Sequence, residues 1–490
     1  MVHLLQISCG ILSLFLCCVI NAFSPSSQVQ SSVNDRPNII LILADDQGYS
    51  DLSCYGHPIL ETPHIDQLAA EGIKFTNCYA AAPNCSPARA GLLTGRVPSR
   101  TGIYDWVPSG GPMHLPVTEI TIATLLQKAG YATCQVGKWH LSKWVNSSKN
   151  PKMQRPLPDD HGFDHWFGVD NNAKPNHHNP INYFRNGVPL GKLEGYACHL
   201  VVEEGIKWID SLKKNKPFFL YVPFNEPHTP LGSPPELKKY YQSKTKDVKK
   251  AEYYANVANI DLAVGKLMRA LDDRGLRDNT LVIYSSDNGP ARGDNGVYKG
   301  VTLRGRKSSL YEGGIREPGI VRWPKVIAKG QTITNPVHAV DVLPTLCEVV
   351  GILPPQDRIL DGCSWLPLLK NQKFQRGKPL FWYFYKSSPC AVLRSGDWVM
   401  TADPKKENKF RSKSHMFDKD DLHYIKNTEL GQFALYNIEK DIAQKNDVSS
   451  ENPKLFEKLK NQIIKMHTSV VSEGPDWPSL LSDKEMLIRK

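Results

Sequence analysis

The chain has 490 residues, long enough to bury a large core and to form two or more domains. Its composition is ordinary for a globular protein, with 41% hydrophobic and 22% charged residues. The formal net charge of +11 suits a polyanionic substrate. No nucleic-acid recognition motif accompanies this charge, so we do not expect nucleic acid as a partner.

The N-terminus predicts export. Residues 4–20 form an apolar run, and small residues follow near Asn21 and Ala22, as in a secretory signal peptide. An uncleaved membrane anchor is the alternative, although the run is at the short end for a bilayer span. We expect a signal peptide over 1–22, a flexible leader over 23–35, and a periplasmic, extracellular or lysosomal protein according to the host.

Alternating strands and helices then predict an α/β fold. Continuous apolar runs typical of strands buried on both faces lie at 38–44, 131–136, 218–222 and 280–284. Helices are expected from Pro63 to Gly72, near 120–129, around 203–213 and over about 252–272. This alternation favours a large, mostly parallel sheet with right-handed crossovers and flanking helices. The segment 159–189, dense in Asn, His, Pro and Gly, is expected to be a loop.

The sequence changes character after about Lys378. Short β-like runs follow at 380–385, 391–394, 398–401 and 434–438, and a helix is expected near 455–468. We therefore predict a main domain over 36–377 and a small C-terminal domain over 378–490, built as an antiparallel sheet with a helix.

Polar residues follow the carboxyl ends of the predicted strands. They are Asp45, Asp46, Lys138, His140, His228, Asp287 and Asn288. In open α/β sheets the ligand crevice lies outside this edge, so we expect these side chains to gather there. The carboxylate and amide oxygens among them favour a hard cation, Ca²⁺ or Mg²⁺, over zinc. Asp-Asp and Asp-Asn-Gly are also turn sequences, which is the alternative for either segment alone.

A short helix is expected beside this edge. Ser86 is a natural N-cap, Pro87 suits the first helical position, and Gly95 suits the C-terminal end. Cys85 would then lie just outside the helix N-terminus, in a field that favours anions, and Arg89 would reach the same place. A sulfur nucleophile and a fixed cation together indicate an anion-processing site. A buried structural cysteine is the alternative.

The sequence that begins at Cys85 reads Cys-Ser-Pro-Ala-Arg-Ala-Gly-Leu-Leu-Thr-Gly-Arg. It resembles the Cys-x-Pro-x-Arg signature of the type I, formylglycine-dependent sulfatases, which belong to the alkaline-phosphatase-like superfamily. Asp45-Asp46, Gly137-Lys138-Trp139-His140 and Asp287-Asn288 resemble further motifs of that family. The resemblance covers roughly 36–447, and its general character is that of the arylsulfatase and N-acetylgalactosamine-6-sulfatase branch.

The resemblance implies two cofactors. In this family the signature cysteine is oxidised to Cα-formylglycine (3-oxoalanine), so Cys85 would be the substrate of a formylglycine-generating or anaerobic sulfatase-maturating enzyme. One Ca²⁺ would be held by the modified Cys85 and by Asp45, Asp46, Asp287 and Asn288.

The resemblance also implies roles for the remaining polar residues. Arg89, Lys138 and Lys307 would neutralise the charge of the sulfate group. His140 would form a hydrogen bond with the formylglycine hydroxyl, and His228 would protonate the departing alcohol oxygen.

The sequence therefore predicts a secreted sulfatase that hydrolyses a sulfate monoester, on a sulfated carbohydrate or an aryl sulfate. A phosphomonoester or phosphonate hydrolase of the same superfamily, and an unmodified, non-catalytic sulfoglycan-binding protein, are the alternatives. The loop 170–179, with His177 and His178, is expected to help choose the substrate, and a solvated surface loop is the alternative. The sequence fixes neither the sugar, nor the sulfate position, nor the oligomeric state.

Overall fold

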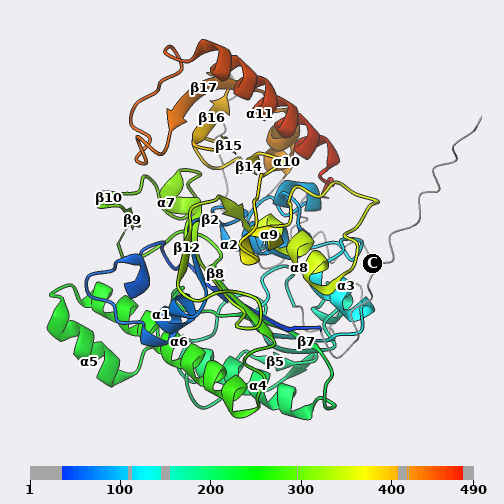
Figure 1. Cartoon of the computed structure of the whole chain (residues 1–490), viewed down its shortest axis with the longest axis vertical. Helices are drawn as coiled ribbons and strands as arrows, with labels where there is room; N and C mark the ends of the chain where they lie inside the picture. The colour runs from blue at the N-terminus through cyan, green and yellow to red at the C-terminus, as the bar shows by residue number, and fades with distance from the viewer. Residues whose placement is uncertain are drawn as a thin grey trace, which may run out of the picture.

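The computed structural model describes residues 36–108, 113–144, 155–294, 296–406, 417 and 419–477, so the expected signal peptide and leader lie outside the described residues. A large mixed sheet runs through the molecule, with helices on both faces, and a smaller sheet with a long helix lies at one end (Figure 1). This arrangement confirms the predicted α/β fold. Among the described helices, none combines the length and apolar character needed to cross a membrane.

The large sheet has parallel strands at its centre. Its strands, in spatial order, are β12 (Gln331–Ile333), β2 (Ile73–Tyr79), β11 (Arg316–Arg322), β8 (Thr280–Ser286), β1 (Asn38–Ala44), β7 (Phe218–Pro223), β3 (Ala132–Lys138), β4 (His165–Val169), β5 (Phe184–Arg185) and β6 (Val188–Pro189), with β13 (Val337–His338) paired to β2. The strand β1 pairs in parallel with β7 and β8, and β3 pairs in parallel with β7 and β4. The carboxyl ends of these five strands therefore share one edge.

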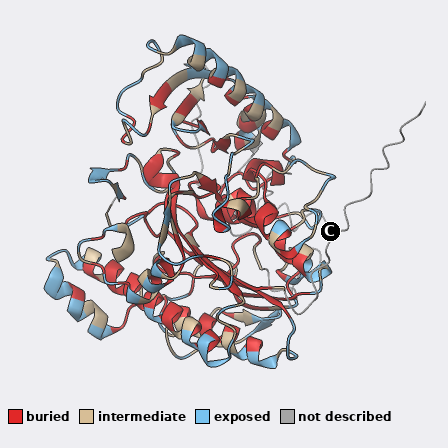
Figure 2. Cartoon of the chain, in the orientation of Figure 1, coloured by how far each residue is buried: buried red, intermediate tan, exposed pale blue. Residues whose placement is uncertain are grey.

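The two faces of the sheet are buried under different helices. Ile39 and Leu41 of β1 pack in one core, under α2 (Cys85–Thr94), α3 (Ile122–Lys128), α8 (Val342–Val350) and α9 (Leu366–Leu369). Ile40 and Ile42 pack in a second core, under α1 (Pro63–Ala70), α4 (Ala197–Ser211) and α6 (Val248–Asp273). Figure 2 shows the buried layer that results on both sides. This double burial explains why β1 is a continuous apolar run.

The C-terminal part is an antiparallel sheet with helices, as predicted. Its strands are β14 (Leu380–Tyr383), β15 (Ala391–Ser395), β16 (Trp398–Pro404) and β17 (Leu430–Asn437), and its helices are α10 (Lys419–Asn427) and α11 (Pro453–Glu473). The indole Nε1 of Trp382 in β14 donates to the carbonyl oxygen of Ala80, 2.8 Å away. Leu459 and Ile463 of α11 belong to the same core as Ile39. The small sheet is therefore packed directly on the main part of the chain.

Several elements differ from the predictions. The expected loop 159–189 contains β4, β5 and β6, and β2 and β11 had no predicted counterpart. In β2 the buried Asn77 interrupts the alternating apolar residues, and β11 begins with the buried Arg316 and Glu317, so neither strand shows a continuous apolar run. The remaining elements are α5 (Pro235–Lys244), α7 (Glu312–Ile315), β9 (Val297–Tyr298), β10 (Val301–Thr302) and short 3₁₀ turns at Ser53–Tyr55, Pro98–Thr101, Asp159–His161 and Ala339–Asp341.

Candidate active site

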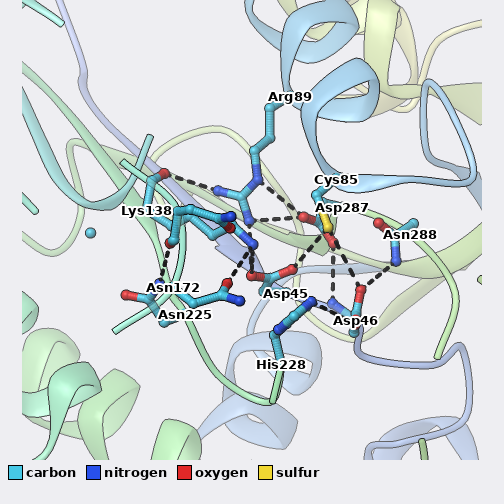
Figure 3. Close-up of polar contacts among 12 residues, drawn as sticks. Asp45, Asp46, Cys85, Arg89, Lys138, Asn172, Asn225, His228, Asp287 and Asn288 are labelled. Atoms are coloured by element: carbon cyan, nitrogen blue, oxygen red, sulfur yellow. Dashed lines mark hydrogen bonds and ion pairs between the residues drawn. The ribbon is translucent and has the colours of Figure 1, made fainter. Parts of the chain in front are cut away.

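The polar residues predicted at the strand ends meet beside the N-terminus of α2 (Figure 3). They come from the ends of β1, β3 and β8 and from the turn after β7, which the parallel pairing brings to one edge. The residues brought together are Asp45, Asp46, Cys85, Arg89, Lys138, His140, His228, Asp287, Asn288 and, from the segment before α7, Lys307.

An acidic cluster forms the floor of this site. Ligand atoms of Asp45, Asp46, Cys85 and His228 all lie within 4.8 Å of one another. The Asn288 side chain joins the cluster through its Nδ2, which donates to Asp46 Oδ1 at 2.7 Å. Its Oδ1 is buried and has no hydrogen-bond partner among the described residues. A buried amide oxygen next to carboxylates is a fitting donor for a hard cation.

Asp287 is tied to the same cluster. One of its carboxylate oxygens accepts from the backbone N–H of Asp46 at 3.1 Å. The other accepts from Nε and Nη2 of Arg89 at 3.1 and 2.8 Å. The Arg89 Nη1 donates to the carbonyl oxygen of Lys138 at 3.0 Å, so this buried guanidinium links the ends of β3 and β8 to α2.

Two lysines pair with the other carboxylates. Lys138 Nζ lies 2.6 Å from Asp45 Oδ2, and Lys307 Nζ lies 2.7 Å from Asp46 Oδ1. Burial opposes ionisation, but Lys138 and neighbouring cations hold the pKa of the Asp45 carboxyl well below its usual range. For Asp287, burial and the nearby Asp45 raise the pKa to about 7, against the effect of Arg89. The three carboxylates of Asp45, Asp46 and Asp287 are paired with the cations of Lys138, Lys307 and Arg89, so the side-chain charges of the cluster nearly balance.

Cys85 is the first residue of α2. The N-cap is Asn84 rather than the predicted Ser86, because the Asn84 side chain accepts from the backbone N–H of Cys85 at 3.0 Å. The Ser86 hydroxyl accepts from the backbone N–H of Val107 instead. The helix therefore begins earlier than the sequence indicated, and Cys85 stands within its first turn rather than outside it. Gly95 ends the helix in the left-handed conformation, as predicted.

The Cys85 sulfur faces the cluster. Its Sγ lies 3.5 Å from Asp45 Oδ1 and 3.4 Å from Lys307 Nζ. Burial raises the pKa of the Cys85 thiol, although Lys138 and Lys307 act in the opposite direction. The unmodified side chain is therefore a neutral thiol rather than a thiolate nucleophile.

The Gly137-Lys138-Trp139-His140 segment turns sharply at the end of β3. Gly137 has a φ of +126°, and a Cβ there would lie 2.0 Å from the carbonyl oxygen of Pro223, so only glycine fits. Lys138 then points to Asp45, and the Trp139 ring is buried. His140 has a φ of +56°, and neither of its ring nitrogens has a hydrogen-bond partner among the described residues.

His140 and His228 both line the open space above Cys85. Burial, reinforced by Lys138, holds the pKa of His140 well below its usual range, so the ring is neutral. Burial also lowers the pKa of His228. Nδ1 of His228 lies 2.6 Å from the carbonyl oxygen of Thr229 and donates to it, which leaves Nε2 facing Asp46 Oδ2 at 3.6 Å.

The cavity above Cys85 has a volume of about 670 Å³. Its walls include residues that the sequence motifs do not contain, namely Asp105, Trp106, Asn171, Asn172, Ser308, Phe384 and Lys386. Asn171 and Asn172 lie in the predicted specificity loop, whose Asn-rich composition was the available signal. The remaining lining residues lie in segments that show neither a motif nor an apolar periodicity, so the sequence did not predict that they line the cavity.

His177 and His178 are not among the residues that line this cavity, in contrast to the prediction. His177 is buried, and its Nδ1 lies 3.3 Å from Nδ2 of Asn256 in α6. The His178 ring stacks on Tyr196 with a centroid distance of 4.6 Å. His177 therefore packs the loop against α6, whereas His178 is exposed and stacked on Tyr196, and the role of this loop in substrate choice stays a prediction.

The α/β sheet, the acidic cluster at its strand ends and the cysteine at the start of α2 define an α/β protein with a candidate anion-processing site at the carboxyl edge of its sheet. The comparison with protein families is specific. A family model described as "Sulfatase" matches residues 37–352, and one described as "N-sulphoglucosamine sulphohydrolase, C-terminal" matches residues 306–469. The chain belongs to the sulfatase family and is a sulfuric ester hydrolase.

Individual relatives agree with this assignment. Human N-acetylgalactosamine-6-sulfatase is 35% identical over 394 residues, which cover 74% of this chain and 71% of that protein. Human arylsulfatase A is 37% identical over 385 residues, with 73% and 72% covered. Among solved structures, Ps i-CgsB in complex with k-i-k-neocarrahexaose is similar with a TM-score of 0.75 and 28% identity, over 92% of this chain and 96% of that chain.

Proposed function

We propose that this sulfatase removes the sulfate group from a sulfated carbohydrate, with a Cα-formylglycine derived from Cys85 and one bound Ca²⁺. The observation that carries the proposal is the position of Cys85, in the first turn of α2 and within reach of both Asp45 and Lys307. Two similar proteins support the carbohydrate, namely human N-acetylgalactosamine-6-sulfatase and the complex of Ps i-CgsB with k-i-k-neocarrahexaose.

The residues of the acidic cluster fit a calcium ion. Asp45, Asp46 and Asp287 would contribute carboxylate oxygens, and the unpartnered Oδ1 of Asn288 would contribute a neutral one. When bound, the ion supplies positive charge that stabilises the oxygens of the sulfate group. His228 lies within the same group of side chains and also lines the cavity, and we assign it to proton transfer rather than to the metal.

Modification of Cys85 supplies a nucleophile that the thiol does not. When present, the hydrated formylglycine would supply a hydroxyl nucleophile for sulfur and a second hydroxyl for the release of sulfate. We assign the conversion to a formylglycine-generating or anaerobic sulfatase-maturating enzyme of the host. The first residues of α2 orient this position, because Asn84 fixes the backbone N–H of Cys85.

The side chains around Cys85 then handle charge and protons. Arg89, Lys138 and Lys307 would offset the negative charge of the sulfate oxygens. His140 has two unpartnered ring nitrogens at the cavity and would hold the hydroxyl of the modified residue. His228, whose Nδ1 is fixed by Thr229, would deliver a proton from Nε2 to the departing alcohol oxygen.

Export is also proposed, on the sequence alone. We infer that residues 1–22 are removed and that the mature chain begins at Phe23. Sequencing the N-terminus of the protein recovered outside the cytoplasm tests this, and an intact Met1 in that fraction would contradict it.

The test of the proposed chemistry compares two leaving-group-matched esters. Protein with a converted Cys85 is assayed on p-nitrophenyl sulfate and on p-nitrophenyl phosphate, with Cys85→Ala as the control for contaminating activity. We expect kcat/KM to favour the sulfate by about 100-fold or more, which is ~2.7 kcal/mol of transition-state discrimination. A preference for the phosphate would instead support the phosphomonoester hydrolase, and binding without turnover would support the sulfoglycan-binding protein.

A further inference from the structure

One wall of the cavity takes no part in the chemistry proposed above. It is formed by Trp106, Phe384 and Lys386, with Asp105 behind Lys386. Asp105 and Trp106 follow the first 3₁₀ turn after α2, whereas Phe384 and Lys386 lie between β14 and β15 of the small sheet. The C-terminal part of the chain therefore contributes to the walls of the cavity that contains Cys85.

Lys386 is held in place by a buried carboxylate. Its Nζ lies 2.7 Å from Asp105 Oδ2, and the Asp105 side chain is only 3% exposed. The other oxygen of Asp105 accepts from Asn84 Nδ2 at 3.0 Å and from the backbone N–H of Trp106 at 2.8 Å. Both carboxylate oxygens of Asp105 thus have hydrogen-bond partners within the protein. Asp105 fixes Lys386 and also supports the N-cap of the helix that carries Cys85.

The ammonium of Lys386 keeps donors for a ligand. It has three N–H groups, of which the Asp105 contact uses one. It also lies 5.4 Å from the centroid of the Tyr385 ring. The side chain is 21% exposed and lines the cavity, so the remaining donor capacity is open to what enters there.

A second lysine paired with a buried carboxylate lies beside Cys85. Lys307 is paired with the buried carboxylate of Asp46, is 18% exposed and lines the same space. A lysine fixed in this way loses little conformational entropy when it binds an anionic oxygen. The cavity therefore offers two preorganised ammonium groups, Lys307 beside Cys85 and Lys386 beside Asp105.

We propose that Lys386, fixed by Asp105 and flanked by Trp106, is a specificity-determining residue that binds a second anionic group of the substrate. This rests on the proposed function, because it places the scissile sulfate over Cys85. The second group is a carboxylate or a further sulfate on the same sugar or on the next one. An anionic oxygen gains the Coulombic attraction of the Lys386 ammonium in addition to the hydrogen bond, whereas a neutral sugar hydroxyl gains only the hydrogen bond. Asn171 lines the same cavity and carries a neutral amide for hydroxyls, whereas the amide of Asn172 is used by Lys138 and Thr229.

The experiment compares substrates that differ in one charge. The four probes are p-nitrophenyl sulfate, a hexosamine with one sulfate, the same hexosamine with two sulfates, and the singly sulfated hexosamine linked to a hexuronate. For Lys386→Met we expect kcat/KM on the doubly charged probes to fall about 10- to 100-fold, the range of a charge-assisted hydrogen bond. On the two singly charged probes the change should stay within about twofold, since the groups around Cys85 are untouched. The doubly charged probe whose kcat/KM falls the most identifies the second anionic group as a sulfate or a carboxylate.

Three further variants control for structure and for net charge. Lys386→Met leaves Asp105 buried without its partner, so the double variant Lys386→Met/Asp105→Asn removes both charges and should show the same selectivity. Lys386→Arg should keep most of the preference for the doubly charged probes. Lys238→Met removes a lysine that is paired with Glu252 away from the cavity, and it should change none of the four rates.

Equal losses on all four probes, or no loss on the doubly charged ones, would overturn the proposal and leave the sulfatase assignment intact. Failure of the wild type, with Cys85 converted, to hydrolyse any probe would reject the proposed chemistry instead. In that case calorimetric binding of the doubly charged sugars to Cys85→Ala and to Cys85→Ala/Lys386→Met still tests the subsite. Equal affinity of these two proteins would refute a role for Lys386.

Discussion

At the scale of single residues, charge balance determines what this site binds. Three carboxylates, Asp45, Asp46 and Asp287, are paired with three side-chain cations, so the side chains alone are close to neutral. A divalent cation in this cluster would make the site net positive, which a sulfate ester requires. The proposed calcium ion therefore has an electrostatic role for the ligand as well as for the fold.

Removing one cluster carboxylate tests the metal site. In Asp46→Ala we expect bound calcium to be lost, kcat to fall about 100-fold or more, and the melting temperature to drop, because the remaining charges lose their counter-ion. Elemental analysis and thermal unfolding with and without a chelator measure both effects. Asp170→Asn, which changes a carboxylate paired with Lys143, is the control and should retain the metal. Full activity of metal-free wild type would rule the calcium ion out.

His228 gives a pH dependence with a definite sign. Because burial lowers its pKa below the usual 6.5, the proton on Nε2 is present in acid and is lost as the pH rises through that value. The rate on a sugar sulfate, which has a poor leaving group, should therefore fall on the alkaline side of a pKa below 6.5.

The matching variant separates this role from a structural one. In His228→Ala the rate on a sugar sulfate should fall about 10²- to 10⁴-fold. The rate on p-nitrophenyl sulfate should fall much less, because its leaving group needs no proton. His199→Ala, which removes a ring bonded to Asn259 outside the cavity, should lose neither rate. Equal losses of His228→Ala on both esters would argue against proton transfer to the leaving group.

At the scale of the elements, the stability of α2 depends on the glycine that ends it. Gly95 has a φ of +70°, and a Cβ there would lie 3.1 Å from Cβ of Leu343 in α8. Gly351 ends α8 with a similar φ of +73°, but no atom lies within 4 Å of its Cβ position. Both positions favour glycine, and only the first is also crowded.

These two glycines form a matched pair for measurement. Gly351→Ala should lower the free energy of unfolding by about 1–2 kcal/mol, the penalty for a left-handed alanine. Gly95→Ala should lower it by more, and should also reduce kcat, because Leu343 or the end of α2 has to shift. Denaturant unfolding monitored by circular dichroism gives both values, and identical losses would show that the contact with α8 does not matter.

The central strands were predictable because they are buried on both faces. The apolar runs at 38–44 and 280–284 correspond to β1 and most of β8. By contrast, β11 begins with two buried charged residues, Arg316 and Glu317, and contains Pro318 and Gly319, so no apolar periodicity reveals it. Arg316 is stabilised there by the rings of Tyr49 and Tyr298, contacts that no local pattern encodes.

The candidate site, like the fold, could be predicted in part. The groups at the ends of β1, β3 and β8 could be placed together, because parallel strands share an edge. The Asp105–Lys386 pair could not be predicted, because its two residues lie 281 positions apart in the sequence. Asp105 follows the 3₁₀ turn at Pro98–Thr101, and Lys386 lies between β14 and β15. The packing of His177 beside Asn256 could not be predicted either, because composition alone does not distinguish a loop side chain that faces a cavity from one that packs on a helix.

At the scale of the whole molecule, we propose that the boundary between 36–377 and 378–490 divides two sheets but not two folding units. Trp382 donates to the carbonyl oxygen of Ala80, and Tyr104 donates to that of Pro475, each at 2.8 Å. Arg100 Nη1 contacts Glu473 Oε2 at 2.7 Å. One continuous core contains residues of both parts.

The chain should therefore unfold in a single cooperative step. We expect one calorimetric transition, with a ratio of calorimetric to van't Hoff enthalpy near unity, and we expect a chain ending at residue 377 to aggregate, because its apolar contacts with β14 and α11 are exposed. Two separate transitions, or a soluble and folded truncated chain, would show that the parts are independent.

The central claim is that Cys85, once converted to formylglycine, is the reactive group of this sulfatase. Mass spectrometry of the peptide that contains Cys85, carried out on preparations from hosts with and without a maturating enzyme, tests it most directly. We predict an aldehyde that reacts with hydrazides, in a fraction proportional to the specific activity on p-nitrophenyl sulfate. Full activity in a preparation whose Cys85 is entirely an unmodified thiol would contradict the account.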